Sequence, residues 1–585
     1  MTSGDPRLDE VLDACASGDF PRAHAACLRL SRARPADPRV ASTLAMILLN
    51  LGKVEEAVAP ARKAAALAPN DPQARINLAR VLALTADVAG ALAALGEARR
   101  LAPADPEPRR VESLIHAEHM RFVECINACD AGLALAPGDR DLAATRAMAL
   151  LNTARPEDAY HALGDLARAR ADDDYVLSCR ALVSNYVPGL PAREIFDVHR
   201  AWAALLEHAT PLSPRGPRTS VPAGRLRVAL LTPDLRRHSV AYFALPLLAA
   251  LDRARCEVWV YYTNRHADGL TVRARALADR WIDCANIADA TLAERIRFDA
   301  PDVLLELSGH TSGHSLACVH RRPAPLVATY LGYPNTTGLR AVDLRLTDSH
   351  ADPADSLATE RLVRLDPCFL AFEPPAEAPD PAPRPAGTPP TFGSFNAVSK
   401  LNEYTIGLWT RVLDAAPGSR LVLKAMHLRD DSLRRDIAAR FAARGADPAR
   451  VLVLPPAPTT AAHLASYGAI DVALDPFPYH GTTTTLEALW MGVPVVSLPG
   501  ETHASRVGVS ILTNAGLPDL IARDADDYVR LATALTADAA RRAALRTELR
   551  GRLRASPLLD ARGLATRLLD ALGAPLGTTG VDPGR

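Results

Sequence analysis

Residues 475–494, DPFPYHGTTTTLEALWMGVP, place a glycine and four threonines directly before an amphipathic helical pattern. Threonine is a mediocre helix former, but its hydroxyl can join the free N–H groups of a helix's first turn in holding an anion. Gly481 permits close backbone approach, and Thr482, Thr483 and Thr484 supply hydroxyls. A diphosphate suits such a place, although a Ser/Thr-rich helix cap with nothing bound has the same pattern.

Two further candidates each follow a predicted strand. Lys400, in SFNAVSKLNE, is placed to neutralise a leaving phosphate, unless it is an ordinary solvated surface charge. His238, in TPDLRRHSVAYF, is a candidate base or a partner for a substrate hydroxyl, because the pKa of histidine lies near neutrality. A structural histidine is the alternative at that position.

The sequence does not favour a metal site. His310 and His314 have i, i+4 spacing and His320 follows them, but Ser and Gly interrupt the segment and the general-base Glu of a metalloprotease helix is missing. A glycine-rich cleft loop is the preferred interpretation. The chain has no G-x-x-x-x-G-K-[ST] motif and no D-x-D at a predicted strand end. We therefore predict neither a P-loop nor a bound metal.

Composition limits the partners and the compartment. The 585 residues include 67 basic and 67 acidic side chains, so no global field would collect nucleic acid or anionic lipid. The nine cysteines are scattered without a C-x-x-C pair, which is typical of reduced thiols in the cytosol. No apolar run approaches the roughly 20 residues that span a bilayer, and the polar start is no signal peptide. We predict a cytoplasmic protein with no nucleic-acid or membrane partner.

The first third of the chain repeats with a period of 34 residues. Small residues recur in register between Pro/Asp-containing stops, which allows antiparallel helices to pack closely. The pattern resembles the tetratricopeptide repeat, with about five copies over residues 3–172. Such arrays bind peptides or partner proteins, or mediate self-association, so an oligomer is left open. The recurring segments are RPADP (34–38), APNDP (68–72), APADP (102–106) and APGDR (136–140).

A different pattern follows the repeats. Residues 173–222 are predicted to be connecting helices and a linker, and a proline-rich linker is predicted at 373–390. Short β-rich runs alternate with helical patterns in two lobes, 223–372 and 391–575, and 576–585 is predicted to be a frayed tail. Open parallel sheets bind ligands at the C-terminal ends of their strands, so a cleft between the lobes is expected. The runs are 225–232, 256–263, 302–307, 325–331 and 343–348, then 391–396, 419–425, 450–455, 471–476 and 493–499.

These segments together resemble the protein O-linked N-acetylglucosamine transferases, including their plant and bacterial relatives. The resemblance covers essentially the whole chain, and its motifs are specific in combination. It implies an α/β GT-B glycosyltransferase, with two Rossmann-like lobes after a helical repeat array, that uses a UDP-sugar such as UDP-GlcNAc without a metal. The segments that carry it are the repeats, DLRRHS, PAPLVATYLGYPNTTG, SFNAVSK and LDPFPYHGTTTTLEALWMGVPVVSLPGETHASRVGVSIL.

The resemblance also implies roles for single residues. Lys400 matches the family lysine on the donor diphosphate, and Thr483 and Thr484 match the two phosphate-binding threonines. His238 matches the active-site histidine, and Asp299 an aspartate proposed for proton relay. The remaining donor-binding positions are Gly481, Thr482 and His480 beside the threonines, Glu487 at the ribose, and Ala457 and His463 in the uridine-binding segment.

The chain also departs from the family pattern. Ala397 replaces a glutamine next to the lysine, Thr482 replaces a histidine, and His480 stands where asparagine is common. The asparagine ladder that grips peptide backbone in the animal enzymes keeps only Asn77, which argues against acceptor recognition by such a ladder. The other ladder positions hold Thr43, Val111 and Thr145.

The sequence therefore predicts an inverting, metal-independent enzyme that moves N-acetylglucosamine from UDP-GlcNAc to Ser/Thr hydroxyls of proteins. The general base is left open between His238, Asp299 and a phosphate oxygen of the donor. One alternative is the same scaffold with another UDP-hexose, such as UDP-glucose, or with an Asn acceptor. Another is a repeat scaffold whose transferase body is degenerate and only binds.

Overall fold

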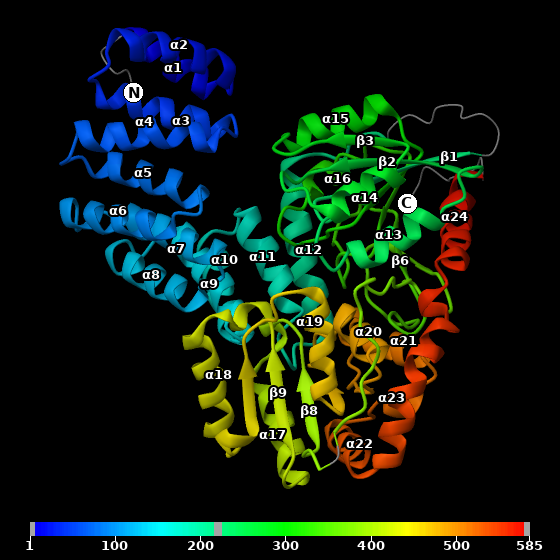
Figure 1. Cartoon of the computed structure of the whole chain (residues 1–585). Helices are drawn as coiled ribbons and strands as arrows, with labels where there is room; N and C mark the ends of the chain where they lie inside the picture. The colour runs from blue at the N-terminus through cyan, green and yellow to red at the C-terminus, as the bar shows by residue number, and fades with distance from the viewer. Residues whose placement is uncertain (1–5, 216–224, 386, 578–585) are drawn as a thin grey trace. The chain divides into compact units, whose positions relative to one another are not determined.

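The computed structural model describes residues 6–215, 225–385 and 387–577. The end of the predicted linker and the predicted tail from residue 578 onward lie outside these residues. The chain divides into two compact units, Met1–Leu150 and Leu151–Arg585 (Figure 1). The predicted repeat region, 3–172, extends past this division. None of the helices in the described part of the chain combines the length and apolar character that crossing a bilayer requires.

The first unit consists of antiparallel helix pairs, as the repeat predicts. Asp37 and Asp71 cap two of the helices by accepting from the backbone N–H of Arg39 (3.0 Å) and Gln73 (2.9 Å), and a proline begins each of those helices. The helices are α1 (Pro6–Ala16), α2 (Phe20–Ala33), α3 (Pro38–Asn50), α4 (Val54–Leu67), α5 (Pro72–Leu84), α6 (Val88–Leu101), α7 (Glu107–Glu118), α8 (Phe122–Leu135) and α9 (Arg140–Asn152), the last of which runs across the division.

The small residues of the repeat lie where the helices pack. Each of them is fully buried, so the period of 34 residues places them at the contacts between helices. A larger side chain at these positions would push the helices apart, which explains the composition of the register. They are Ala45, Ala79, Ser113 and Ala147 in the first helices of the pairs, and Ala57, Ala91, Cys125 and Ala159 in the second.

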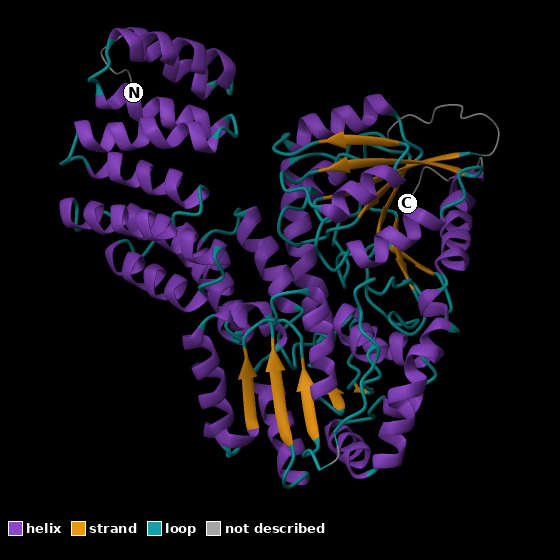
Figure 2. Cartoon of the chain, viewed as in Figure 1, coloured by secondary structure: helices purple, strands orange, loops and turns teal. Residues whose placement is uncertain are grey.

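The second unit begins with three helices and continues into a wholly parallel sheet (Figure 2). The strand order is β3-β2-β1-β4-β5-β6-β7, so the connections reverse direction between β1 and β4. The elements are α10 (Pro156–Ala169), α11 (Asp174–Ser184), α12 (Ala192–Ala209), β1 (Leu226–Thr232), α13 (Ala241–Ala250), β2 (Cys256–Tyr262), α14 (Gly269–Leu277), β3 (Arg280–Asp283), α15 (Asp289–Asp299), β4 (Val303–Glu306), α16 (Leu316–His320), β5 (Leu326–Thr329), β6 (Leu344–Thr347) and β7 (Arg361–Arg364).

A second parallel sheet forms the other lobe, with the order β10-β9-β8-β11-β12 and a reversal between β8 and β11. The predicted fold class, two doubly wound α/β lobes after a helical repeat array, is confirmed. The elements that lead to the site are β8 (Thr391–Ser394), η1 (Val398–Lys400), α17 (Glu403–Ala415), β9 (Arg420–Lys424), η2 (Met426–Arg429), α18 (Asp431–Ala443), η3 (Pro448–Arg450), β10 (Val451–Leu454), α19 (Thr460–Ala465), η4 (Ser466–Ala469), β11 (Val472–Leu474), α20 (Thr483–Trp490) and β12 (Val495–Val496).

The end of the chain ties the two lobes together. The last helix, α24, leaves the second lobe and packs against α13 and β5 of the first. Arg255, just before β2, also pairs with Asp570 of α24 at 2.6 Å. The remaining elements are η5 (His503–Ser505), α21 (Val507–Asn514), η6 (Pro518–Leu520), α22 (Ala525–Ala537), α23 (Ala539–Arg554), η7 (Pro557–Leu559) and α24 (Ala561–Gly577).

Gly332 permits a close approach of two backbone segments in the first lobe. A Cβ atom there would lie 1.6 Å from the carbonyl oxygen of Leu307, just after β4. We expect Gly332→Ala to lower the thermal midpoint by several degrees, because a backbone clash cannot be relieved by a side-chain rotation. Gly551→Ala is the control, since Gly551 lies in α23 with open space around it and alanine should stabilise that helix slightly. Equal midpoints for the two variants in thermal unfolding would contradict this account.

Candidate active site

One cavity is lined by loops from both sheets, at the places where the strand order of each sheet reverses. The cavity has a volume of about 350 Å³, within the range of small-molecule sites. Loops after β1 and β4 line it from the first lobe, and loops after β8 and β11 from the second, as expected for doubly wound sheets. Its polar lining residues are Tyr186, His238, Ser239, Thr311, Asn396, Lys400, Tyr479, Thr482, Thr483, Thr484 and His503.

The threonine run opens helix α20 at the cavity. Thr484 donates its hydroxyl to Asn396 Oδ1 at 2.8 Å, whereas the buried Thr483 hydroxyl has no hydrogen-bond partner among the described residues. A Cβ atom on Gly481 would lie 2.5 Å from the Thr484 hydroxyl, so only glycine fits there. An unpaired buried hydroxyl beside free first-turn N–H groups leaves donors for an anion.

Two residues before the threonines support this loop from behind. Asp475 accepts from the backbone N–H of Gly481 at 2.7 Å. His480 uses its whole ring internally: Nε2 donates to the Leu498 carbonyl at 2.8 Å, and Nδ1 accepts from the Gly508 N–H at 3.1 Å. Burial lowers the pKa of His480, which favours the neutral ring. The structure thus places the His480 imidazole outside the cavity lining, where it holds the loop in position.

Lys400 brings a positive charge to the same cavity, with its side chain partly buried. Its Nζ donates to the His480 carbonyl at 2.7 Å and lies 4.6 Å from the centre of the Tyr479 ring. Burial lowers the pKa of Lys400 to about 8, and Asp475 opposes that shift. A cation with neutral partners in a low-dielectric place strongly favours an incoming anion.

A second polar cluster lies beside α20 and contains two of the residues predicted for the nucleoside, His463 and Glu487. His463 of α19 contacts Glu487 of α20 through Nε2 at 3.0 Å, and Tyr467 donates to the same carboxylate oxygen at 3.3 Å. Lys424, at the end of β9, donates to His463 Nδ1 at 3.0 Å. Ala457 lies in the connection between β10 and α19 and is partly exposed.

His238 lines the cavity from the first lobe, opposite the threonine loop. Its Nδ1 accepts from the Val240 N–H at 3.4 Å and lies 3.7 Å from Asp234 Oδ1. Burial lowers the pKa of His238, while Asp234 opposes that shift. A neutral histidine next to a carboxylate is suited to taking a proton from a hydroxyl.

Asp299 is not brought to the cavity. Its carboxylate lies at the end of α15, where it accepts from Tyr261 (2.9 Å) and Arg295 (2.8 Å) and pairs with Arg280 (3.1 Å). Although burial alone would raise it, the hydrogen bonds from Arg295 and Tyr261 and the charge of Arg280 lower the pKa of Asp299. The predicted proton relay finds no support in this placement.

The three histidines of the predicted cleft loop do not converge on a point. The Ser178 hydroxyl contacts both His310 Nδ1 (2.9 Å) and His314 Nε2 (3.1 Å), and His320 Nε2 donates to the Thr210 carbonyl (2.6 Å). In the described ranges of the chain, no group of three or more His, Cys, Asp or Glu residues could hold a metal ion. These histidines fasten the helices before the first lobe to that lobe.

Sequence reasoning missed several residues of the site. Tyr186, in the loop after α11, stacks on Tyr479 with ring centres 4.4 Å apart, so the connecting helices contribute to the cavity wall. Asn396 and Lys424 lie at the C-terminal ends of predicted strands, and Lys400 follows one of these strands. Because ligands bind at such strand ends, this position could have identified Asn396 and Lys424 as site residues. Nothing local in the sequence distinguishes Tyr186.

The fold and the site together define two doubly wound α/β lobes around one cavity that is suited to an anion. The model of glycosyl transferase family 41 matches residues 206–370 and 389–568, more than half of the chain. The chain therefore belongs to glycosyl transferase family 41. A tetratricopeptide repeat model matches residues 8–72 and 43–106, which confirms the repeats.

Individual relatives support the same assignment. A solved structure titled as a mutant of Thermobaculum terrenum O-GlcNAc transferase is 35% identical, with a TM-score of 0.80, and the match covers 86% of this chain and 96% of that one. A probable UDP-N-acetylglucosamine–peptide N-acetylglucosaminyltransferase, SPINDLY of Arabidopsis thaliana, is 38% identical over 67% of this chain and 44% of that protein. The chain thus matches less than half the length of this curated relative. A Caenorhabditis elegans UDP-N-acetylglucosamine–peptide N-acetylglucosaminyltransferase is 23% identical over 61% of this chain and 41% of its own length.

The lowered pKa of Lys400 predicts a pH dependence of anion binding. Below its pKa of about 8 the side chain is charged, and it loses that charge as the pH rises. We expect the affinity for UDP to fall above about pH 8 in the wild type and to stay flatter in Lys400→Arg, because arginine keeps its charge. Calorimetric titrations between pH 6.5 and 9.5 measure both slopes. Lys424→Met is titrated in parallel, because burial also lowers the pKa of Lys424 to about 8. Identical slopes in the wild type and Lys400→Arg would contradict this assignment.

The unpaired hydroxyl of Thr483 provides a second test. Thr483→Val removes that hydroxyl while keeping the shape of the side chain, so the fold should be unchanged or slightly more stable. We expect UDP affinity to fall about tenfold, which corresponds to one lost hydrogen bond. Thr485→Val is the matched control, because the Thr485 hydroxyl donates to the Gly481 carbonyl at 3.0 Å within the loop. Unchanged affinity in Thr483→Val would remove Thr483 from the anion site.

Proposed function

We propose that this chain is an inverting, metal-independent glycosyltransferase that moves N-acetylglucosamine from UDP-GlcNAc to Ser or Thr hydroxyls of proteins. The proposal rests on one observation: Lys400 and the first turn of α20, with its threonines, line the same cavity. The family and the names of the relatives support the sugar and the protein acceptor.

The donor diphosphate is the group that the second lobe is suited to hold. Negative charge grows on it as the glycosidic bond breaks, so donors that strengthen with that charge lower the barrier. Lys400 supplies a cation, Thr483 a free hydroxyl, and the first turn of α20 its N–H groups. Since this set supplies positive potential at the leaving group, we propose that no metal is needed.

The nucleoside is assigned to the cluster beside α20. Glu487 is placed to accept from ribose hydroxyls, and it is oriented by His463 and Tyr467. Lys424, whose pKa burial lowers to about 8, adds a donor next to His463. The uridine would then lie on the second lobe with its diphosphate directed toward Lys400.

The acceptor approaches from the side of the first lobe. Its hydroxyl oxygen forms a bond to the anomeric carbon while the bond to the diphosphate oxygen breaks, and UDP leaves with the bonding electron pair from the opposite face, which inverts the configuration. The acceptor proton passes to His238 or to a phosphate oxygen of the donor. The Asp234 carboxylate, 3.7 Å from His238 Nδ1, would stabilise the positive charge that forms if the ring takes the proton.

The repeats are the proposed contact for protein acceptors, but through a chemistry other than an asparagine ladder. Asn77, the single ladder residue, donates its amide to Ser42 Oγ at 2.7 Å within the array. Its side chain is therefore already engaged by the repeats themselves. The face that meets an acceptor must use other side chains.

Removal of the Lys400 cation tests the catalytic part of the proposal. We expect Lys400→Ala to lower kcat by about 10²- to 10³-fold, the usual cost of losing a group that stabilises developing charge, with an unchanged fold. Release of UDP with a protein acceptor measures kcat, and circular dichroism checks the fold. Lys63→Ala, at an exposed lysine of the repeats, is the control. A wild-type kcat in Lys400→Ala would show that Lys400 does not stabilise the leaving diphosphate.

A donor panel tests the substrate. UDP-GlcNAc and UDP-glucose are offered with protein acceptors in EDTA, and mass spectrometry identifies the sugar and the modified residue. We expect N-acetylhexosamine on Ser or Thr from UDP-GlcNAc. Transfer of glucose alone, or sugar on Asn, would establish the alternative enzymes, and UDP binding without any product would establish a binding scaffold.

A further inference from the structure

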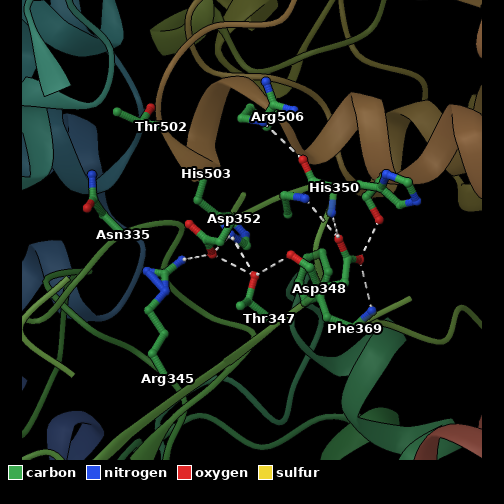
Figure 3. Close-up of polar contacts among 12 residues, drawn as sticks. Asn335, Arg345, Thr347, Asp348, His350, Asp352, Phe369, Thr502, His503 and Arg506 are labelled. Carbon is green, nitrogen blue, oxygen red and sulfur yellow. Dashed lines mark hydrogen bonds and ion pairs between the residues drawn. The ribbon is translucent and has the colours of Figure 1, made fainter. Parts of the chain in front are cut away.

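A buried polar network joins the two lobes at the edge of the cavity (Figure 3). It is built on the end of β6, where Arg345, Thr347, Asp348 and Asp352 are almost fully buried. From the second lobe, His503 reaches across to it: its Nδ1 lies 2.7 Å from Asp352 Oδ2. Buried charged groups of this kind are costly unless they are paired, so their arrangement is well defined.

The contacts fix the tautomer of His503. Asp352 Oδ2 also accepts from the Thr347 hydroxyl at 2.6 Å and lies 3.5 Å from the Arg345 guanidinium. Burial alone would raise it, but Arg345 and His503 hold the pKa of Asp352 well below its usual range, so Asp352 is a carboxylate and His503 Nδ1–H donates to it. When the imidazole is uncharged, its one proton therefore lies on Nδ1, where it is donated to Asp352. Its Nε2 then keeps a free lone pair.

His503 is among the residues that line the cavity. Its hydrogen bonds to the described residues are all made by Nδ1, so none of them occupies Nε2. The next residue, Ala504, accepts from the backbone N–H of His480 at 2.9 Å, so His503 lies directly beside the loop that carries Thr482–Thr484. A group attached to a diphosphate on that loop would reach it.

The surroundings of His503 match a sugar better than a phosphate. The Phe369 ring lies edge-on to the imidazole with centres 5.0 Å apart, and Leu370 and Val507 add apolar surface to the same wall. A neutral imidazole nitrogen accepts hydrogen bonds, and a phosphate, which only accepts, cannot pair with it. A sugar hydroxyl donates such a bond, and the apolar faces of a sugar ring pack against such a wall.

We propose that His503, oriented by Asp352, accepts a hydrogen bond from a hydroxyl of the donor hexose and so recognises the sugar end of the donor. The inference rests on the proposed function, because it assigns a further contact to the same substrate. Two other inter-lobe bonds hold the network in place: Ser510 donates to Asp348 Oδ2 at 2.5 Å, and Arg506 Nε donates to the His350 carbonyl at 3.0 Å. The same contacts that hold the two lobes together therefore also fix the position of His503 Nε2.

His503→Asn separates sugar recognition from lobe contact. The asparagine amide occupies roughly the place of Nδ1 and can still donate to Asp352, but nothing replaces Nε2. His350→Asn is the matched control: His350 joins the network through its carbonyl, and its side chain is not part of the cavity lining. The affinities for UDP and UDP-GlcNAc are measured by calorimetry for the wild type and both variants, without an acceptor.

The expected result is about a tenfold loss of UDP-GlcNAc affinity in His503→Asn, with UDP affinity unchanged, and wild-type values in His350→Asn. An unchanged ratio of the two affinities in His503→Asn would overturn the proposal. A parallel loss of UDP affinity would also overturn it, because His503 would then act only through the lobe structure. Failure of the wild type to bind UDP would instead contradict the proposed function.

Discussion

The site depends on one unfavourable interaction, the partial removal of the Lys400 ammonium group from water. Among the described residues no carboxylate forms an ion pair with it, and its contacts are the His480 carbonyl and the Tyr479 ring. Removing a cation from water without a partner anion costs free energy, as its lowered pKa of about 8 reflects. A bound diphosphate would pair with the ammonium group and offset this cost, which favours binding. The protein has no net charge, so this local potential, not a global field, must attract the donor.

The surrounding fold is arranged so that this charge stays in place. Lys400 follows β8 and the threonine loop follows β11, the two neighbouring strands at which the second sheet reverses. The Asp475 side chain accepts from the loop's own backbone, the His480 ring anchors the loop to Leu498 and Gly508, and Gly481 leaves room for Thr484. The opposite lobe is fastened by α24 and by the Asp352–His503 contact, which closes the cavity over the same point. Rigid support of this kind gives preorganised donors their catalytic value.

Much of this could be predicted because the signals are local. Apolar β-rich runs identified the interior strands, and a 34-residue period identified the repeats. The strands β3 (RWID) and β7 (RLVR) were not predicted, because they form the two edges of the first sheet, where arginines replace apolar residues. Asp299 and His480 were predicted as site residues from motif position alone. Their actual partners, such as Arg280 and the Leu498 carbonyl, are distant in sequence and leave no local signal.

The most direct test of the account is a crystal structure of the chain with UDP, grown in EDTA. The account predicts the diphosphate against Lys400 Nζ, the Thr483 hydroxyl and the first-turn N–H groups of α20, with the uridine beside His463 and Glu487 and no metal ion bridging the phosphates. A diphosphate bound away from Lys400, or one that orders only when a divalent cation is added, would contradict it.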